Sequence, residues 1–70
     1  MIAIQEFIKH YEDSIIPSYF VQNFKNDYEF KNWCRQGTIE DLYCALKAFE
    51  QYEEYEHCKI IKTVIDEKTR

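Results

Sequence analysis

The apolar residues of the C-terminal half recur at intervals of three and four, which is the spacing of one face of an α-helix. The residues with this spacing are Ile39, Leu42, Leu46, Phe49, Cys58, Ile61 and Ile65. Thr38 is followed three residues later by Asp41, an arrangement typical of the capping box that begins a helix. An acidic, aromatic stretch around Gln51–Glu54 separates the two periodic runs. The pattern predicts a helical hairpin over residues 38–68.

A second amphipathic pattern lies at the N-terminus. Its apolar members are Ile4, Phe7, Ile8, Tyr11 and Ile15. They form one buried stripe, and the helix should end near Ser14 or Ile15, because the residue before Pro17 is pushed away from helical geometry.

His10 flanks this stripe and follows Glu6 by four residues. A catalytic base would need a nucleophile or a second base beside it, and the pattern around His10 supplies neither. We therefore interpret it as a surface histidine near a carboxylate.

Residues 17–25 allow two interpretations. Pro17 is favoured in the first turn of a helix, whereas the alternation of Phe20, Gln22 and Phe24 with their neighbours also fits a strand. A strand needs a partner and the chain has no second β-rich run, which favours the helix.

A third helix can begin at Asn26–Asp27, and it carries Phe30, Trp33 and Cys34 on one face. Asn is a favoured helix-capping residue. Gly37 is placed to end this helix in left-handed geometry.

The composition fits one small all-α domain, a bundle of four or so short helices. Residues 1–37 form its N-terminal helices and residues 38–68 its hairpin. The 70 residues include one Gly and one Pro, which leaves little room for hairpin turns between strands. Charged residues are 31% and hydrophobic residues 46% of the chain, a balance that argues against disorder.

No apolar run approaches the roughly 20 residues of a membrane span, and the charged N-terminus is unlike a signal peptide. We expect a cytoplasmic protein.

Cys34, Cys44 and Cys58 are odd in number and far apart. This usage indicates reduced thiols packed as small hydrophobic residues in a cytosolic protein. A zinc site would need all three with His57 or His10, and zinc ligands usually come in closely spaced pairs.

The chain has no glycine-rich phosphate loop, no G-x-S-x-G and no H-E-x-x-H. We expect no metal, no cofactor and no enzymatic activity.

The aromatic residues before Gly37 could form a core or a stacking platform for single-stranded nucleic acid. They are Tyr19, Phe20, Phe24, Tyr28, Phe30 and Trp33. A platform needs a basic groove beside the rings, but Asp27 and Glu29 lie among the nearby cations and the net charge is −4. We therefore favour the core and expect no nucleic-acid partner.

The stretch EEYEHCKIIKTVI resembles the second half of the UVR motif, the helical hairpin of bacterial nucleotide-excision-repair subunits and several stress regulators. Glu53, Glu54, Tyr55 and Glu56 match its opening. The later matches are Cys58 at the small position, Ile61 at the Leu, Lys62 at the Arg and Ile65 at the final Ile. Thr63 departs from the motif's Asp, and Lys62 from its Arg.

LYCALKAFEQ resembles the first arm of the same motif, and the resemblance covers none of the first 37 residues. It implies a protein–protein docking module that pairs hairpin with hairpin.

These observations favour a small non-enzymatic interaction protein or regulator that binds a partner protein. Its expected contact residues are Glu53, Glu54, Tyr55, Ile60 and Val64. The apolar arc of the last helix is broader than one neighbouring helix needs, so we expect a homodimer with Ile60 and Val64 near its axis. Alternatively, the first helix covers the same arc and leaves a monomer.

Two other functions are compatible with the sequence. The glutamates of Glu50–Glu56, the small size and the negative charge also suit an acidic inhibitor from a phage or mobile element. Such a protein would occupy the basic nucleic-acid channel of a host or defence enzyme. The third hypothesis is a nucleic-acid-binding domain that uses aromatic stacking.

Overall fold

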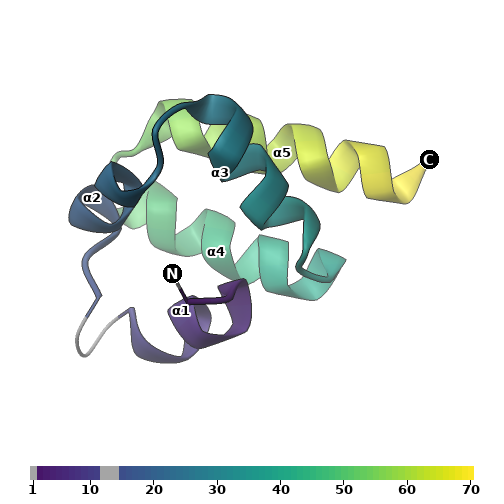
Figure 1. Ribbon diagram of the computed structural model, residues 1–70. Coiled ribbons are helices and arrows are strands. Elements are labelled where there is room, and N and C mark those ends of the chain that lie inside the picture. Colours follow the sequence, from purple (N-terminus) through teal and green to yellow (C-terminus); the bar gives the residue numbers. More distant parts are fainter. Residues whose placement is uncertain (1, 12–14) are drawn as a thin grey trace.

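The computed structural model describes residues 2–11 and 15–70, and within these ranges it is all-α, as predicted (Figure 1). Five α-helices lie in the described residues, and a short 3₁₀ turn at Val21–Asn23 follows the second. The helices are α1 (Ile4–His10), α2 (Pro17–Phe20), α3 (Asp27–Arg35), α4 (Ile39–Gln51) and α5 (Tyr55–Thr69). Residues 17–23 are thus helical, and the strand alternative for this segment is wrong.

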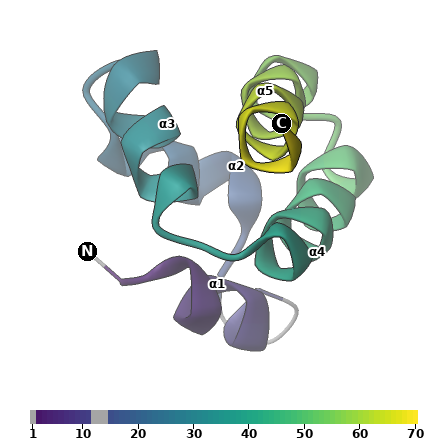
Figure 2. The ribbon, with the colours of Figure 1, turned by 90° about the vertical axis from the view of Figure 1, so that its right-hand side faces the viewer.

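The predicted hairpin is the centre of the fold. Helices α4 and α5 run back along each other, α3 packs on α5, and α1 packs on α4. Figure 2 shows α1 beside α4, at the edge of the molecule farthest from α5. No helix in residues 2–11 and 15–70 is both long and apolar enough to span a bilayer.

Two helix starts follow the capping signals of the sequence. The Asn26 side chain accepts a hydrogen bond from the Glu29 amide at 2.9 Å. Thr38 Oγ1 accepts from the Asp41 amide at 3.1 Å, and Asp41 Oδ2 accepts in return from the Thr38 amide at 3.1 Å. Both predicted caps are confirmed, and they satisfy amides that the first turn of a helix leaves without an intrahelical partner.

The predicted end of the first helix is wrong, and the third helix ends before Gly37 as predicted but without the predicted left-handed geometry. The first helix ends at His10, Ile15 is not helical, and Ser14 lies outside the described residues. Gly37 does not have the positive φ of a left-handed cap. A Cβ built on Gly37 would lie 2.7 Å from Cγ2 of Ile4, so the position needs glycine because α1 approaches the backbone there.

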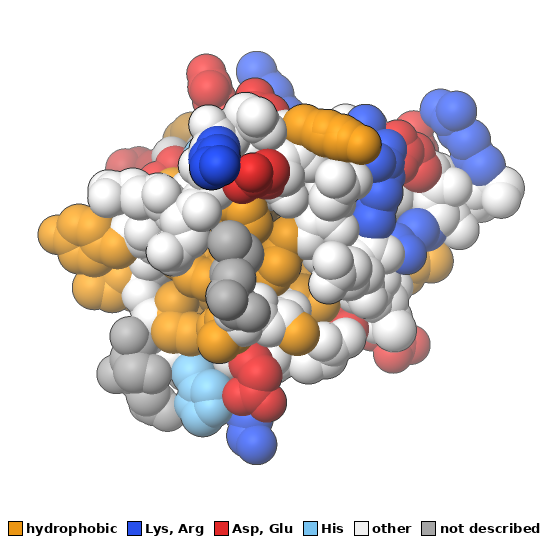
Figure 3. Space-filling model, in the orientation of Figure 1, with side chains coloured by type: hydrophobic (Ala, Val, Ile, Leu, Met, Phe, Trp, Pro, Cys, Tyr) orange, Lys and Arg blue, Asp and Glu red, His pale blue; other side chains and the backbone are white. Residues whose placement is uncertain are grey.

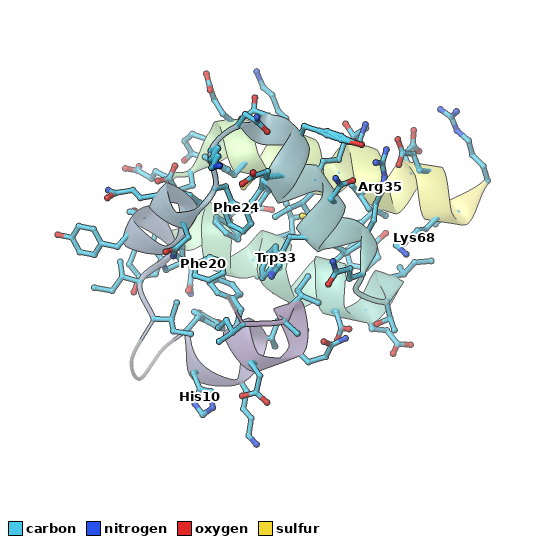
Figure 4. The ribbon with its side chains drawn as sticks, in the orientation of Figure 1. His10, Phe20, Phe24, Trp33, Arg35 and Lys68 are labelled. Carbon is cyan, nitrogen blue, oxygen red and sulfur yellow. The ribbon has the colours of Figure 1, made fainter. Side chains whose placement is uncertain are left out.

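Most of the aromatic residues before Gly37 belong to the core, as predicted. Phe20, Phe30 and Trp33 are buried and Phe24 is half-buried, and all four rings pack in or against the core. In Figure 4, Phe20, Phe24 and Trp33 point toward one another between α1, α2 and α3. Tyr19 and Tyr28 are the exceptions, because they are 69% and 61% exposed.

The apolar arc of α5 is covered within the chain, where both α4 and α3 pack on this helix. Ile61 and Val64 are fully buried, Ile65 is nearly so, and Ile60 is half-buried. The charged edges of the two helices are also joined, since Glu67 lies 3.2 Å from both Lys31 Nζ and Arg35 Nε. The arc is therefore covered by α4 and α3 rather than by the first helix, and Val64 is not available for a dimer axis. The homodimer itself stays a prediction.

Candidate functional site

The turn between α4 and α5 has a fixed and unusual backbone. Glu53 has a φ of 58°, in the left-handed region that glycine normally occupies. The Glu54 amide donates to the Phe49 carbonyl at 2.9 Å, and the Glu53 amide donates to the Glu50 carbonyl at 3.1 Å. These two bonds make a Schellman motif that satisfies the last carbonyls of α4. The side chains of this turn therefore project from a backbone that hydrogen bonds hold in one conformation.

Six exposed residues surround this turn, and we refer to them as the turn surface: Glu50, Gln51, Tyr52, Glu53, Tyr55 and Glu56. Tyr52 is 42% exposed and Tyr55 58% exposed. Within the part of the chain that the structure describes, none of the three glutamates lies in a salt bridge. The surface thus combines two amphipathic rings with carboxylates that can accept hydrogen bonds from a cationic partner.

The predicted contact residues do not all meet at one surface. Glu53 and Tyr55 belong to the turn surface, whereas Glu54 is half-buried and faces His57. Ile60 is half-buried farther along α5, and Val64 is in the core. The structure therefore leaves Glu53 and Tyr55 as the exposed members of the predicted set.

His57 connects the turn to the core, a role that the sequence pattern did not indicate. Its ring lies edge-on to Phe30 with centroids 4.8 Å apart, and it stacks on Phe49 at 6.1 Å. Nδ1 is buried without a hydrogen-bond partner and lies 3.5 Å from Oε2 of Glu54. The ring thus packs beneath the turn as a largely apolar group.

His10, the other histidine, lies at the surface, where Nε2 is 3.5 Å from Glu6 Oε2. In Figure 4 it points away from the rest of the molecule. The described residues contain no group of three or more His, Cys, Asp or Glu side chains arranged to hold a metal ion.

The three thiols are free in the structure. Cys34 and Cys58 are buried as predicted, but Cys44 is exposed on α4. Burial raises the pKa of the Cys34 thiol to about 12. Burial and the nearby Glu50 carboxylate also raise the pKa of Cys58. A reactive thiolate needs a lowered pKa, so neither buried cysteine is suited to nucleophilic chemistry.

In Figure 3, hydrophobic side chains reach the surface in the middle of the face shown and at its left edge. The described residues form shallow hollows, one of them beside Trp33 and another beside Phe20. The larger has a volume of about 330 Å³, near the lower end of the range for ligand pockets. Its lining residues are Ile2, Ala3, Phe24, Glu29, Asn32, Trp33 and Gln36. The smaller lies beside Tyr19 and Phe20. Neither lining brings a nucleophile together with a general base.

No protein-family model, curated protein or solved structure matches the chain.

Proposed function

We propose that this protein is a small non-enzymatic interaction protein or regulator that binds a partner protein through the turn surface. One observation carries the proposal: two exposed tyrosines and three carboxylates without salt bridges surround a single hydrogen-bonded turn. Tyrosine provides a large amphipathic contact area with few rotatable bonds to immobilise, and it is enriched at protein interfaces. The free thiols support a place for the protein in the cytoplasm.

The other exposed tyrosines are a weaker basis for binding. Tyr19, Tyr28 and Tyr43 belong to α2, α3 and α4, one to each helix. Single exposed aromatic residues are normal on protein surfaces. Only Tyr52 and Tyr55 are neighbours along the chain, and they share the turn with the glutamates.

The UVR-like pattern supports a docking role with one change. Its apolar positions Cys58, Ile61 and Ile65 are buried within this chain, so they hold the hairpin together. A hairpin-to-hairpin contact would then use the turn surface rather than the apolar arc of α5.

Affinity capture from lysate with tagged variants tests the proposal. Tyr55→Ala should lose a partner that the parent retains, because it removes one of the two exposed rings of the turn surface. Tyr28→Ala is the matched control, since Tyr28 is similarly exposed but lies on α3. A partner that both variants retain, or that both lose, would show that the turn surface is not the contact.

The acidic inhibitor is the second candidate, and the unpaired carboxylates of the turn surface favour it specifically. Contacts between exposed charges weaken as salt screens them. A partner released by modest salt, and displaced by nucleic acid, would indicate that the protein occupies a basic channel. A partner retained at high salt would indicate apolar docking through the tyrosines.

A further inference from the structure

Helix α1 covers an aromatic cleft formed by α2, α3 and α4. Its Phe7 side chain is fully buried there. The Phe7 ring lies 4.9 Å from Phe20, 5.6 Å from Trp33 and 5.4 Å from Phe49, measured between ring centroids. These three rings line the cleft, and Phe7 fills it. We refer to them together as the aromatic cleft.

Helix α1 packs on α4, where Ile4 lies against Gly37 and the half-buried Ile8 also contacts the core. Ile4 and Phe7 are its buried side chains. Gln5 Nε2 donates to Asp41 Oδ2 at 3.0 Å on the surface, and Trp33 Nε1 donates to the Ile2 carbonyl at 2.8 Å. The helix has seven residues and no side-chain hydrogen bond at its N-cap. Isolated helices this short are not stable in water, so α1 is helical only while it is packed.

Helices α3, α4 and α5 make contacts with one another that do not involve α1. The α4–α5 hairpin has its own buried face, α3 packs on α5, and Glu67 bridges Lys31 and Arg35 across that contact. Proteins commonly open in cooperative units of unequal stability, and units with few buried contacts open first.

We propose that α1 is a lid that opens as a unit and exposes the aromatic cleft while α3, α4 and α5 stay folded. The occupant of the cleft is α1 of the same chain, with Phe7 as its anchor. When α1 is packed, it hides the apolar surface of the aromatic cleft. Opening of α1 would regulate access to that cleft. This proposal is independent of the turn surface.

Thiol labelling of the full chain tests the lid. Ile4→Cys and Ile61→Cys make the same chemical change at two fully buried isoleucines, one in α1 and one in α5. Both are made with Cys44→Ser, which removes the exposed thiol. The native Cys34 in each molecule reports whether the rest of the fold has opened. Mass spectrometry gives the labelling rate of each site.

The Ile4→Cys thiol should label at least about tenfold faster than Cys34 in the same molecules. This follows because opening of α1 alone costs less free energy than unfolding of the whole chain. Urea should raise its rate less steeply than that of Cys34, because opening of α1 exposes the aromatic cleft but not the rest of the core. The Ile61→Cys rate should rise with urea as steeply as that of Cys34. Equal rates and equal urea dependence for the Ile4→Cys thiol and Cys34 would show that α1 opens only with the whole chain.

Hydrogen exchange on the unmodified protein tests whether α1 opens without the Ile4→Cys substitution, which could itself loosen the helix. The backbone amides of α1 should exchange through an opening that depends less steeply on denaturant than the global unfolding that the amides of α4 follow. A shared denaturant dependence for both helices would overturn the lid.

Discussion

Replacing Glu53 with glycine should stabilise the protein. The Glu53 backbone lies in the left-handed region, where a Cβ crowds the following carbonyl. That crowding costs about 1–2 kcal/mol for a residue other than glycine. Glycine relieves it but gains about 0.4–1 kcal/mol of conformational freedom in the unfolded chain. The difference leaves a net stabilisation of about 0–1.6 kcal/mol with a midpoint of about 0.8 kcal/mol, which corresponds to a rise in Tm of about 3–6 °C for a domain of this size.

Thermal and urea unfolding followed by circular dichroism measure this difference. Glu53→Gln removes the charge but keeps the Cβ, and it should stay within about 0.5 kcal/mol of the parent, as surface changes usually do. Lys59→Gly places glycine at an exposed interior position of α5, where it should destabilise by about 1 kcal/mol. If Glu53→Gly lowers the Tm as Lys59→Gly does, residue 53 is not left-handed in solution and the described turn is wrong.

Three further predictions follow from burial and charge. Leu46→Ala should lower the free energy of unfolding by about 2–5 kcal/mol, because Leu46 is 9% exposed in the core; a Tm within a degree or two of the parent would exclude this. An alkylating reagent should modify Cys44 first and Cys34 only on unfolding, since burial raises the pKa of Cys34 to about 12; simultaneous modification in the folded protein would contradict it. Hydrogen bonds from Arg35 and Lys31 hold the pKa of Glu67 below its ordinary value of 4.5. Its stabilising contribution is therefore present above pH 4.5 and lost as the pH falls through the lowered pKa. The Tm difference between the parent and Glu67→Gln should shrink in that acid range, and a constant difference would refute the coupling.

The features that the sequence predicted correctly depend on residues close together in the chain. The caps at Asn26 and Thr38 need partners only three residues away, and the helical stripes repeat every three or four residues. Such signals are complete within one element. They identify the buried face of a helix but do not say which other helix covers it.

The features that the sequence did not predict depend on contacts between distant residues. The spacing identifies the stripe of α5 as apolar, but it does not indicate that other helices of the same chain bury Val64 completely. The position of Gly37 in the sequence suggests a left-handed helix cap. In the structure, residue 37 must be glycine because Ile4, 33 positions earlier, packs against it. His57 likewise acquires its position from Phe30 and Phe49 on two other helices.

The backbone of Glu53 sets the turn surface apart from the other described residues, because Glu53 is the non-glycine residue with a positive φ among them. Helix α5 also begins without a capping side chain, as α1 and α2 do. Glu53 occupies a position where glycine would be more stable. Departures from local folding preferences are expected where a residue serves something other than stability. If Glu53 contacts a partner, Glu53→Gly should weaken partner capture while it raises the Tm, whereas a residue without such a role would raise the Tm alone.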